Sequence, residues 1–171
     1  MKLFTSNEFN SLNDLFVDQI QDLYDAEQRI TNALPKMTEA AHSAALKQAF
    51  ESHLRETEGH VTRLETIFRQ IGAETKRETC VAMKGIIEEG EEMVKAKGDP
   101  DVRDAALIAA AQRVEHYEMA GYGTARTFAL RLGRPEVANI LQQTLQEEKA
   151  ADDKLTRIAE AQVNVKAATG V

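Results

Sequence analysis

Four stretches of this chain repeat apolar residues at intervals of three and four, and each is interrupted near its middle by acidic or imidazole side chains. Apolar spacing of this kind is typical of an amphipathic α-helix that buries one face. We expect these helices at about residues 12–41, 44–71, 101–131 and 135–160. Any fold that buries the four apolar faces must also bury the polar side chains that lie on them.

The first and third stretches each place a glutamate inside the apolar series. Glu27 lies between Leu23 and Ile30 in the first stretch. Glu118 holds the corresponding position in the third stretch, four residues after Val114. Because apolar residues flank each glutamate on its own helix face, we predict that both carboxylates point into the protein.

The second and fourth stretches carry polar groups at the corresponding place. In the fourth stretch, Glu148 and Asp152 lie one turn apart on the apolar face. In the second stretch, His53 and His60 lie on the apolar face and Glu56 lies at its edge. All four predicted helices therefore interrupt their apolar face near the middle.

The interrupting residues also lie at similar depths. Residues equally distant from the turn between two antiparallel helices are level, because each residue advances a helix by about 1.5 Å. Glu56 follows Glu27 by 29 residues, and Glu148 follows Glu118 by 30 residues. The two halves of the chain therefore resemble each other, and we predict that their polar residues converge on one internal pocket.

The connections between the stretches indicate the topology. Short reversals near residues 42–44 and 132–134 join the helices in pairs, whereas residues 72–100 form a long connection with a short amphipathic segment. A chain of 171 residues with three prolines and nine glycines suits one helical domain and excludes an all-β fold. We predict an all-α four-helix bundle with one long crossover that carries a short extra helix. The last residues, AQVNVKAATGV, lose the apolar pattern, and we expect them to fray.

Composition excludes several classes of function. A single cysteine, Cys80, rules out an internal disulfide and a thiolate-rich metal site. The net charge of −7 argues against nucleic acid or an anionic membrane as a partner. No signal peptide, membrane span, nucleophile triad or phosphate-binding Gly-rich loop is recognisable, so we expect a soluble cytoplasmic protein.

Buried carboxylates need compensation. Each unpaired carboxylate in a core costs several kcal/mol, whereas the whole fold has about 5–15 kcal/mol of net stability. No Lys or Arg lies on the interrupted faces. The five acids Glu27, Glu56, Glu118, Glu148 and Asp152 would carry five negative charges, which two divalent or trivalent cations can balance. Carboxylates with one or two imidazoles suit iron or manganese, so we predict two metal ions, with iron favoured.

These residues resemble the pattern of the ferritin-like di-iron carboxylate proteins. Within that superfamily the chain is similar to the YciF/YciE-like bacterial stress proteins. The matching segments are LYDAEQRI, HLRETEGHVTRLE, CVAMKGIIEEG, RDAALIAAAQRVEHYEMAGYGT and LQEEKAADDKL. The resemblance implies a ferritin-like four-helix bundle, a homodimer and a link to stress or osmotic responses.

The chain departs from the Glu-x-x-His pattern of that superfamily. Gly59 stands three residues after Glu56, and Ala150 stands where the histidine of the fourth helix is usual. We predict Glu27 and Glu118 as metal ligands, followed by Glu56 and Glu148. The residues that compete for the remaining positions around the metals are His53, His60, Glu115, Glu147 and Asp152.

Several of these residues have a simpler explanation. Glu56 and Glu115 lie at the edge of an apolar stripe, from which a long side chain can extend to water. His53 and His60 could be core histidines that hydrogen-bond to neighbouring carboxylates. Tyr122, like Tyr24, reads as a packing residue whose hydroxyl could also reach a ligand.

Three functions remain in competition. The first is a redox protein whose iron or manganese reacts with peroxide or oxygen. The second is a stress-associated structural or interaction dimer, in which the site only organises the bundle. The third is mineral storage in a shell, for which a single chain gives no test, and the acidic composition disfavours a DNA-associated version.

Overall fold

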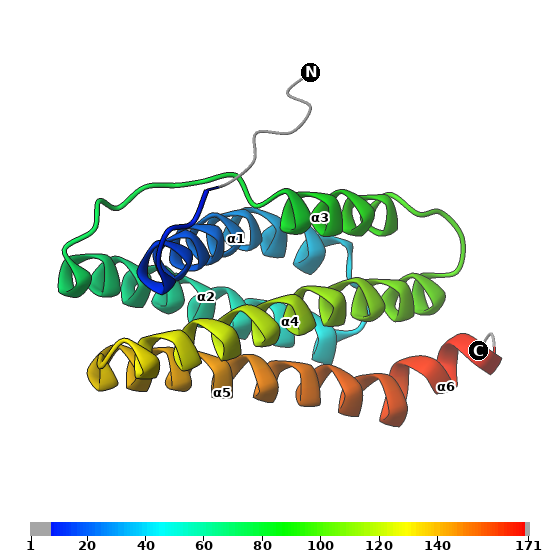
Figure 1. Cartoon of the computed structure of the whole chain (residues 1–171). Helices are drawn as coiled ribbons and strands as arrows, with labels where there is room; N and C mark the ends of the chain where they lie inside the picture. The colour runs from blue at the N-terminus through cyan, green and yellow to red at the C-terminus, as the bar shows by residue number, and fades with distance from the viewer. Residues whose placement is uncertain (1–7, 170–171) are drawn as a thin grey trace, which may run out of the picture.

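The computed structural model describes residues 8–169, which are helical apart from the connecting loops and contain no strand (Figure 1). The elements are α1 (Leu12–Ala40), α2 (Ala44–Ile71), α3 (Val81–Val94), α4 (Pro100–Arg131), α5 (Pro135–Ile158), the π-helix η1 (Ala159–Val163) and α6 (Asn164–Thr169). The four long helices begin and end within two residues of the predicted bounds.

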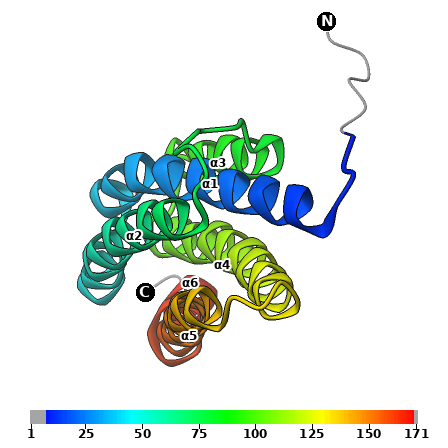
Figure 2. The same cartoon turned by 60° about the vertical axis from the view of Figure 1, so that its left-hand side comes forward.

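The four long helices form a bundle from two helical hairpins. α1 packs on α2, and α4 packs on α5, each pair joined by a short turn. The chain between α2 and α4 returns along the bundle and carries α3, which lies outside the four helices against α1 and α4 (Figure 2). This arrangement confirms the predicted all-α bundle with one long crossover and a short extra helix.

Local sequence explains where the helices start and stop. The Ser11 hydroxyl accepts a hydrogen bond from the backbone N–H of Asp14 and so caps α1, and the Asp99 carboxylate caps α4 in the same way. Gly72 follows α2 with φ 69°, and Gly133 lies just beyond α4 with φ 70°. Glycine suits both positions because a Cβ would strain the backbone at positive φ.

The turn between α1 and α2 depends on a residue from α4. The Ser43 side chain, at the N-cap position of α2, makes no capping hydrogen bond. Instead, the buried carboxylate of Asp104 accepts hydrogen bonds from the backbone N–H groups of His42 at 2.7 Å and Ser43 at 2.6 Å. This contact fixes the first hairpin to the second, and local sequence around the turn gives no sign of it.

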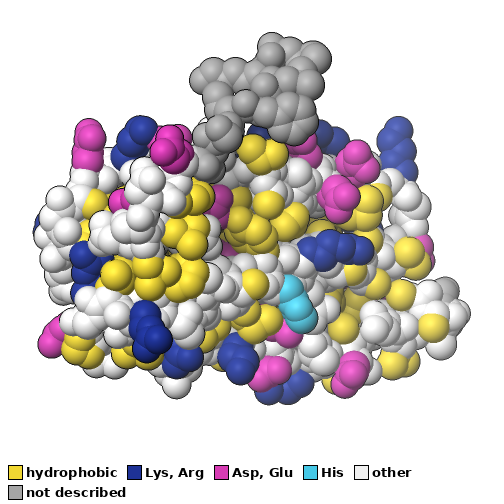
Figure 3. All heavy atoms as spheres, viewed as in Figure 1, with side chains coloured by type: hydrophobic (Ala, Val, Ile, Leu, Met, Phe, Trp, Pro, Cys, Tyr) yellow, Lys and Arg dark blue, Asp and Glu magenta, His cyan; other side chains and the backbone are white. Residues whose placement is uncertain are grey.

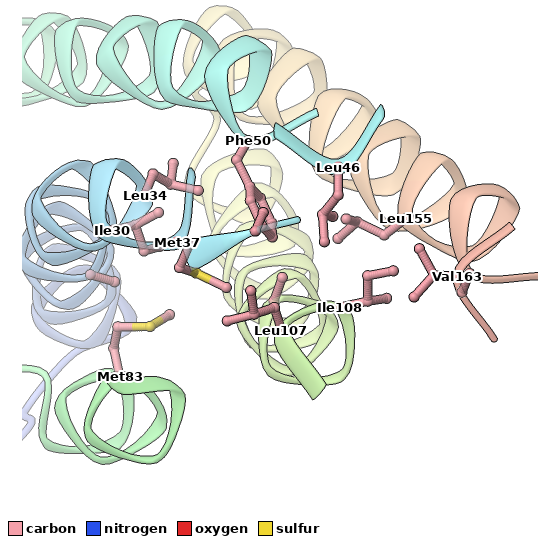
Figure 4. Packing of buried hydrophobic residues seen from close by; sticks show 14 of the residues in the cluster. Ile30, Leu34, Met37, Leu46, Phe50, Met83, Leu107, Ile108, Leu155 and Val163 are labelled. Atoms are coloured by element: carbon pink, nitrogen blue, oxygen red, sulfur yellow. The ribbon is translucent and has the colours of Figure 1, made fainter. Parts of the chain in front are cut away.

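Two separate apolar clusters form the core. The first cluster lies toward the α1–α2 turn, and Figure 4 shows part of it; it includes Ile30, Leu34, Met37, Leu46, Phe50, Met83, Leu107, Ile108, Leu155 and Val163. The second cluster lies toward the α4–α5 turn and includes Phe16, Ile20, Leu23, Leu64, Ile67, Phe68, Tyr122, Ala125 and Leu141. The middle of the bundle, between these clusters, is where each helix carries its polar residues.

The expectation of a frayed C-terminus is wrong for the described residues up to Thr169. Val163 is 1% exposed and packs in the first cluster, near Leu155 and Ile108 (Figure 4). A π-helix uses about one residue more per turn than an α-helix. Leu155, Ala159 and Val163, each four residues after the last, therefore stay on one buried face, whereas α-helical spacing would carry Val163 away from it. The α-helical pattern predicts Ala159 inside and misses Val163.

The surface is mixed in charge. On the face shown in Figure 3, Lys and Arg side chains are scattered among acidic ones. Among residues 8–169, no helix combines the length and the apolar character that crossing a membrane requires.

The packing of η1 leads to a testable prediction. Val163→Asp should lower the free energy of unfolding by about 3 kcal/mol, because a carboxylate would replace a buried apolar group. Val165, two residues later, is 56% exposed. Val165→Asp should therefore change the free energy of unfolding by less than about 0.5 kcal/mol. Urea unfolding of both variants measures the difference, and equal stabilities would show that the segment does not pack as described.

Candidate metal centre

A layer of six polar residues separates the two apolar clusters. All six are at most 7% exposed, and every long helix contributes at least one of them. We call this set the polar layer: Glu27 from α1, His53 and His60 from α2, Glu115 and Glu118 from α4, and Glu148 from α5. Because apolar residues close the layer on both sides, its charged groups are largely removed from water.

The polar layer divides into two groups that could each hold a metal ion. In the first group, His53, Glu115, Glu118 and Glu148 offer ligand atoms that all lie within 4.8 Å of one another. In the second group, Glu27, His60 and Glu148 do the same. Glu148 belongs to both groups, so its carboxylate lies where it could bridge two ions.

The polar layer contains an unusual number of unpartnered polar atoms. Within the described residues, twelve buried side-chain N and O atoms lack a hydrogen-bond partner, and eight of them belong to these six residues. Both oxygens of Glu118 and both of Glu148 are among the eight. Buried polar atoms in folded proteins are normally satisfied. A cation bound at the centre would satisfy these atoms together, and their oxygen and imidazole nitrogen donors fit iron or manganese.

The carboxylates of the layer are held in an environment that disfavours their charge. Burial raises the pKa of Glu118 well above its ordinary value, and the carboxylates of Glu27 and Glu148 raise it further. Burial also raises the pKa of Glu115 well above its usual range, although His53 opposes the effect. The pKa of Glu27 is raised by burial too. Without a compensating cation, the layer therefore favours protonated carboxyl groups.

The two imidazoles respond in the opposite sense. Burial alone would lower the pKa of His53, but the neighbouring carboxylate of Glu115 and others outweigh it and raise the pKa to about 9. For His60, the carboxylates of Glu148 and Glu27 overcome burial and raise the pKa to about 11. Both histidines thus act as positive counter-charges when no metal is bound, and a metal would compete with these protons.

Each imidazole is also held from outside the layer by a carboxylate. His60 points Nδ1 into the second group, 2.9 Å from Oε1 of Glu148, while its Nε2 lies 2.9 Å from Oε2 of Glu147. Arg63 donates two hydrogen bonds to Glu147, which holds that carboxylate in place. His53 has the same arrangement, with Nδ1 3.4 Å from Oε2 of Glu56 and Nε2 facing the first group. Carboxylates in this position orient metal-binding histidines.

Tyr122 connects the polar layer to the second apolar cluster. Its hydroxyl is buried and donates a hydrogen bond to Oε1 of Glu27 at 2.5 Å. The hydroxyl of Tyr24 instead donates to Glu65 near the surface. Of the two tyrosines singled out in the sequence, only Tyr122 touches the layer, and it contacts the glutamate of the other half of the chain.

The structure brings six of the nine predicted or competing ligand residues together and leaves three outside. Glu56 has a side chain that is 44% exposed and touches only the outer nitrogen of His53 within the site. Asp152 points away from the layer and accepts a hydrogen bond from Gln112 at 3.0 Å. Glu147, considered as a competing ligand, also lies outside both groups. The edge position that the pattern assigns to Glu56 agrees with its exposure.

Two supporting residues have no clear signal in the sequence. Arg63, which holds Glu147, follows His60 by three residues but lies at the side of the apolar face. Asp25 is buried two residues before Glu27, binds the side chains of Arg29 and Arg77, and accepts a hydrogen bond from the backbone N–H of Cys80 at 2.8 Å. It thereby attaches the crossover to α1 next to the layer. Both contacts join segments that are distant in sequence.

The cost of the buried carboxylates leads to a prediction for the metal-free protein. The pKa of Glu118 is higher in the folded state than the unfolded value of about 4.3, so its contribution to stability is lost as the pH rises above that value. After chelation, Glu118→Leu should therefore raise the free energy of unfolding by about 1–4 kcal/mol at pH 8. The gain should be smaller at pH 4, where the carboxyl group is protonated in the folded state and mostly protonated in the unfolded chain.

Denaturant unfolding at the two pH values checks this expectation, with Glu89→Leu on the exposed side of α3 as the control. If Glu118→Leu instead destabilises the chelated protein at pH 8, Glu118 has a structural role that does not depend on a metal.

The sequence and the fold of this chain are similar to those of known proteins. The chain is 46% identical to Protein YciF of Escherichia coli K12 over 158 residues, which is 92% of this chain and 95% of that protein. The crystal structure of the E. coli stress protein YciF matches with a TM-score of 0.88 and 45% identity, covering 91% of this chain and 99% of the other.

Two further structures are similar. A Rhodopseudomonas palustris protein, described only as a candidate structural protein, matches with a TM-score of 0.85 and 42% identity over 90% of this chain and 98% of its own. A Xanthomonas campestris protein with 22% identity shares the fold, with a TM-score of 0.73 over 91% of this chain and 95% of its own. Residues 11–168 match the family described as "Domain of unknown function (DUF892)". The predicted resemblance to YciF-like proteins is thus confirmed, and the chain belongs to the DUF892 family.

Proposed function

We propose that this protein binds two metal ions, iron or manganese, in the polar layer and acts in a stress response by reacting with peroxide or oxygen. The observation that supports the proposal is the convergence of unpartnered buried donor atoms from four helices on two groups that share Glu148. A polar layer that served only for packing would be expected to satisfy its own hydrogen bonds.

Charge supports the same proposal. The layer contains four carboxylates, from Glu27, Glu115, Glu118 and Glu148, and two divalent cations would supply four positive charges. Neutral imidazoles from His53 and His60 would complete the ligand set without adding charge. Oxygen-rich sites with one imidazole per ion suit iron and manganese, which change oxidation state and can therefore reduce peroxide or oxygen.

The residues of this chain would orient the site and exclude water. Tyr122 holds Glu27 through its hydroxyl, and Arg63 holds Glu147 against the outer nitrogen of His60. The second apolar cluster closes the layer toward the α4–α5 turn. Ligands fixed in this way need little reorganisation when charge changes at the centre, which favours electron transfer.

The link to stress rests on the relative from E. coli, which is described as a stress protein. We carry that association over to this chain, together with the homodimer that the family resemblance implies. Native mass spectrometry reports the oligomeric state and the metal content of one sample, so it tests both parts of the proposal.

A second candidate function is a structural or interaction dimer in which the site is not catalytic. The similar protein from Rhodopseudomonas palustris is described as structural, which favours this alternative. The two candidate functions predict different cellular phenotypes. Loss of the metal ligands would leave the phenotype of a purely structural protein unchanged, whereas it would abolish the function of a redox protein.

The proposed metal centre leads to a prediction about metal content. Protein reconstituted with Fe²⁺ or Mn²⁺ without oxygen should retain two equivalents by elemental analysis, melt at a higher temperature than the chelated form and consume peroxide. The double variant Glu27→Ala/Glu118→Ala should retain none, because it removes two of the four carboxylates. Glu58→Ala/Glu89→Ala, which changes two exposed glutamates, is the control. Two equivalents persisting in the Glu27→Ala/Glu118→Ala protein would rule out this ligand set.

A second prediction concerns the carboxylate that holds His60. Glu147→Ala should weaken metal binding about 10–100-fold, because His60 loses the partner of its outer nitrogen. Glu147→Gln should restore part of the affinity, since its amide oxygen can still accept that hydrogen bond. Competition with a chromogenic chelator measures the affinities, with Glu136→Ala, elsewhere on α5, as the control. Equal losses in the Ala and Gln variants would show that the hydrogen bond to His60 is not the cause.

A further inference from the structure

A pocket between α2 and α5 reaches the polar layer from the surface. It has a volume of about 260 Å³, and its deep end is formed by His53 and Glu115. Ala49 on α2 and Ala150 and Ala151 on α5 line its walls, and these small side chains leave space between the two helices. The pocket therefore meets the first ligand group at one imidazole and one carboxylate.

A second space reaches the same two residues from the other side, between α1, α3 and α4. It has a volume of only about 30 Å³, and its walls include Ile86, Ile87 and Val114. In this measure of cavity volume one water needs about 10–15 Å³, so the six waters around a divalent cation need about 60–90 Å³. A hydrated cation thus fits the pocket between α2 and α5 and does not fit the apolar space beside α3.

Two buried donor atoms at the deep end of the larger pocket make no hydrogen bond within the described residues. They are Nε2 of His53 and Oε2 of Glu115, although Nε2 lies 3.3 Å from the other oxygen of Glu115. His53 is 7% exposed and Glu115 is 2% exposed. An ion that crosses the pocket would reach these two donor atoms first.

Two acidic residues stand on opposite walls of the pocket. Glu147 on α5 already binds Arg63 and His60, so its carboxylate is engaged. Glu56 on α2 is 44% exposed at the side chain, and one of its oxygens lies 3.4 Å from Nδ1 of His53. Glu56 can therefore contact both the solvent and the histidine that begins the polar layer.

We propose that the pocket between α2 and α5 is the route by which divalent cations enter the polar layer, and that Glu56 binds the ion in transit rather than as a resident ligand. This inference rests on the proposed function, because it requires that the layer binds metal. It gives Glu56 a role that agrees with its position outside both ligand groups.

The rate of metal uptake tests the route. Chelated protein is mixed with Co²⁺ in a stopped-flow spectrometer, and the visible d–d absorbance of bound Co²⁺ is followed. Glu56→Gln should slow uptake by about tenfold, because a negative charge at a pocket mouth concentrates cations there. It should still bind two equivalents at equilibrium, because the amide oxygen of Gln can still accept the hydrogen bond from Nδ1 of His53. Glu51→Gln, an exposed acid on the same helix, should load at the parental rate.

A second variant tests the pocket itself. Ala151→Leu places a larger side chain in the wall of the pocket, so uptake should slow without a change in final stoichiometry. Lys154→Gln removes a positive charge from the same pocket and should speed uptake. Opposite effects of Glu56→Gln and Lys154→Gln, together with slow loading of Ala151→Leu, support the route.

Other outcomes overturn the inference. If Glu56→Gln and Ala151→Leu load at the parental rate, cations enter elsewhere. If Glu56→Gln binds only one equivalent, Glu56 is a resident ligand. In both cases the parental protein still binds two Co²⁺ ions and the proposed metal centre stands. A parental protein that takes up no Co²⁺ overturns the metal centre, and the route with it.

Discussion

Mutual repulsion among four buried carboxylates is the constraint on which the rest of this structure depends. Glu27, Glu115, Glu118 and Glu148 lie in one layer with two imidazoles, and apolar side chains close the layer on both sides. In the absence of metal, the pKa values of both histidines and of three of the acids are raised. These groups therefore hold protons more readily, and the bound protons partly relieve the repulsion. Protons can thus occupy the layer when cations do not.

The surrounding structure holds the layer at one depth in the bundle. Asp104 attaches α4 to the α1–α2 turn, and Asp25 attaches the crossover to α1, in each case through hydrogen bonds from backbone N–H groups. These anionic side chains bind segments that are distant in sequence, so they limit sliding of the helices along one another. A shift of one turn, about 5.4 Å, would separate the ligand groups completely. The precision of the site therefore comes from buried acids outside it as well as from apolar packing.

Periodicity was sufficient to predict the long helices and the inward position of Glu27, Glu118 and Glu148. It was less informative for α4, whose buried residues cover more than one side because this helix packs against α5, α1 and α3. Glu115 therefore lies inside although the pattern places it at an edge, and Val114, taken as a core residue, is only half-buried. For Asp152 the prediction is wrong in the opposite direction. The pattern places it inside, but one turn of α5 beyond Glu148 its carboxylate lies outside the layer and accepts a hydrogen bond from Gln112.

The two halves of the chain repeat in spacing but not in chemistry. The α1–α2 half contributes one carboxylate and both imidazoles to the layer, whereas the α4–α5 half contributes three carboxylates and no imidazole. As a result, the group around His53 has three carboxylates and the group around His60 has two, with Glu148 common to both. Two identical cations in these groups would experience different negative charge, so their affinities and redox potentials should differ. The repeated spacing sets the depth of the layer, and the residues at that depth make its two sides unequal.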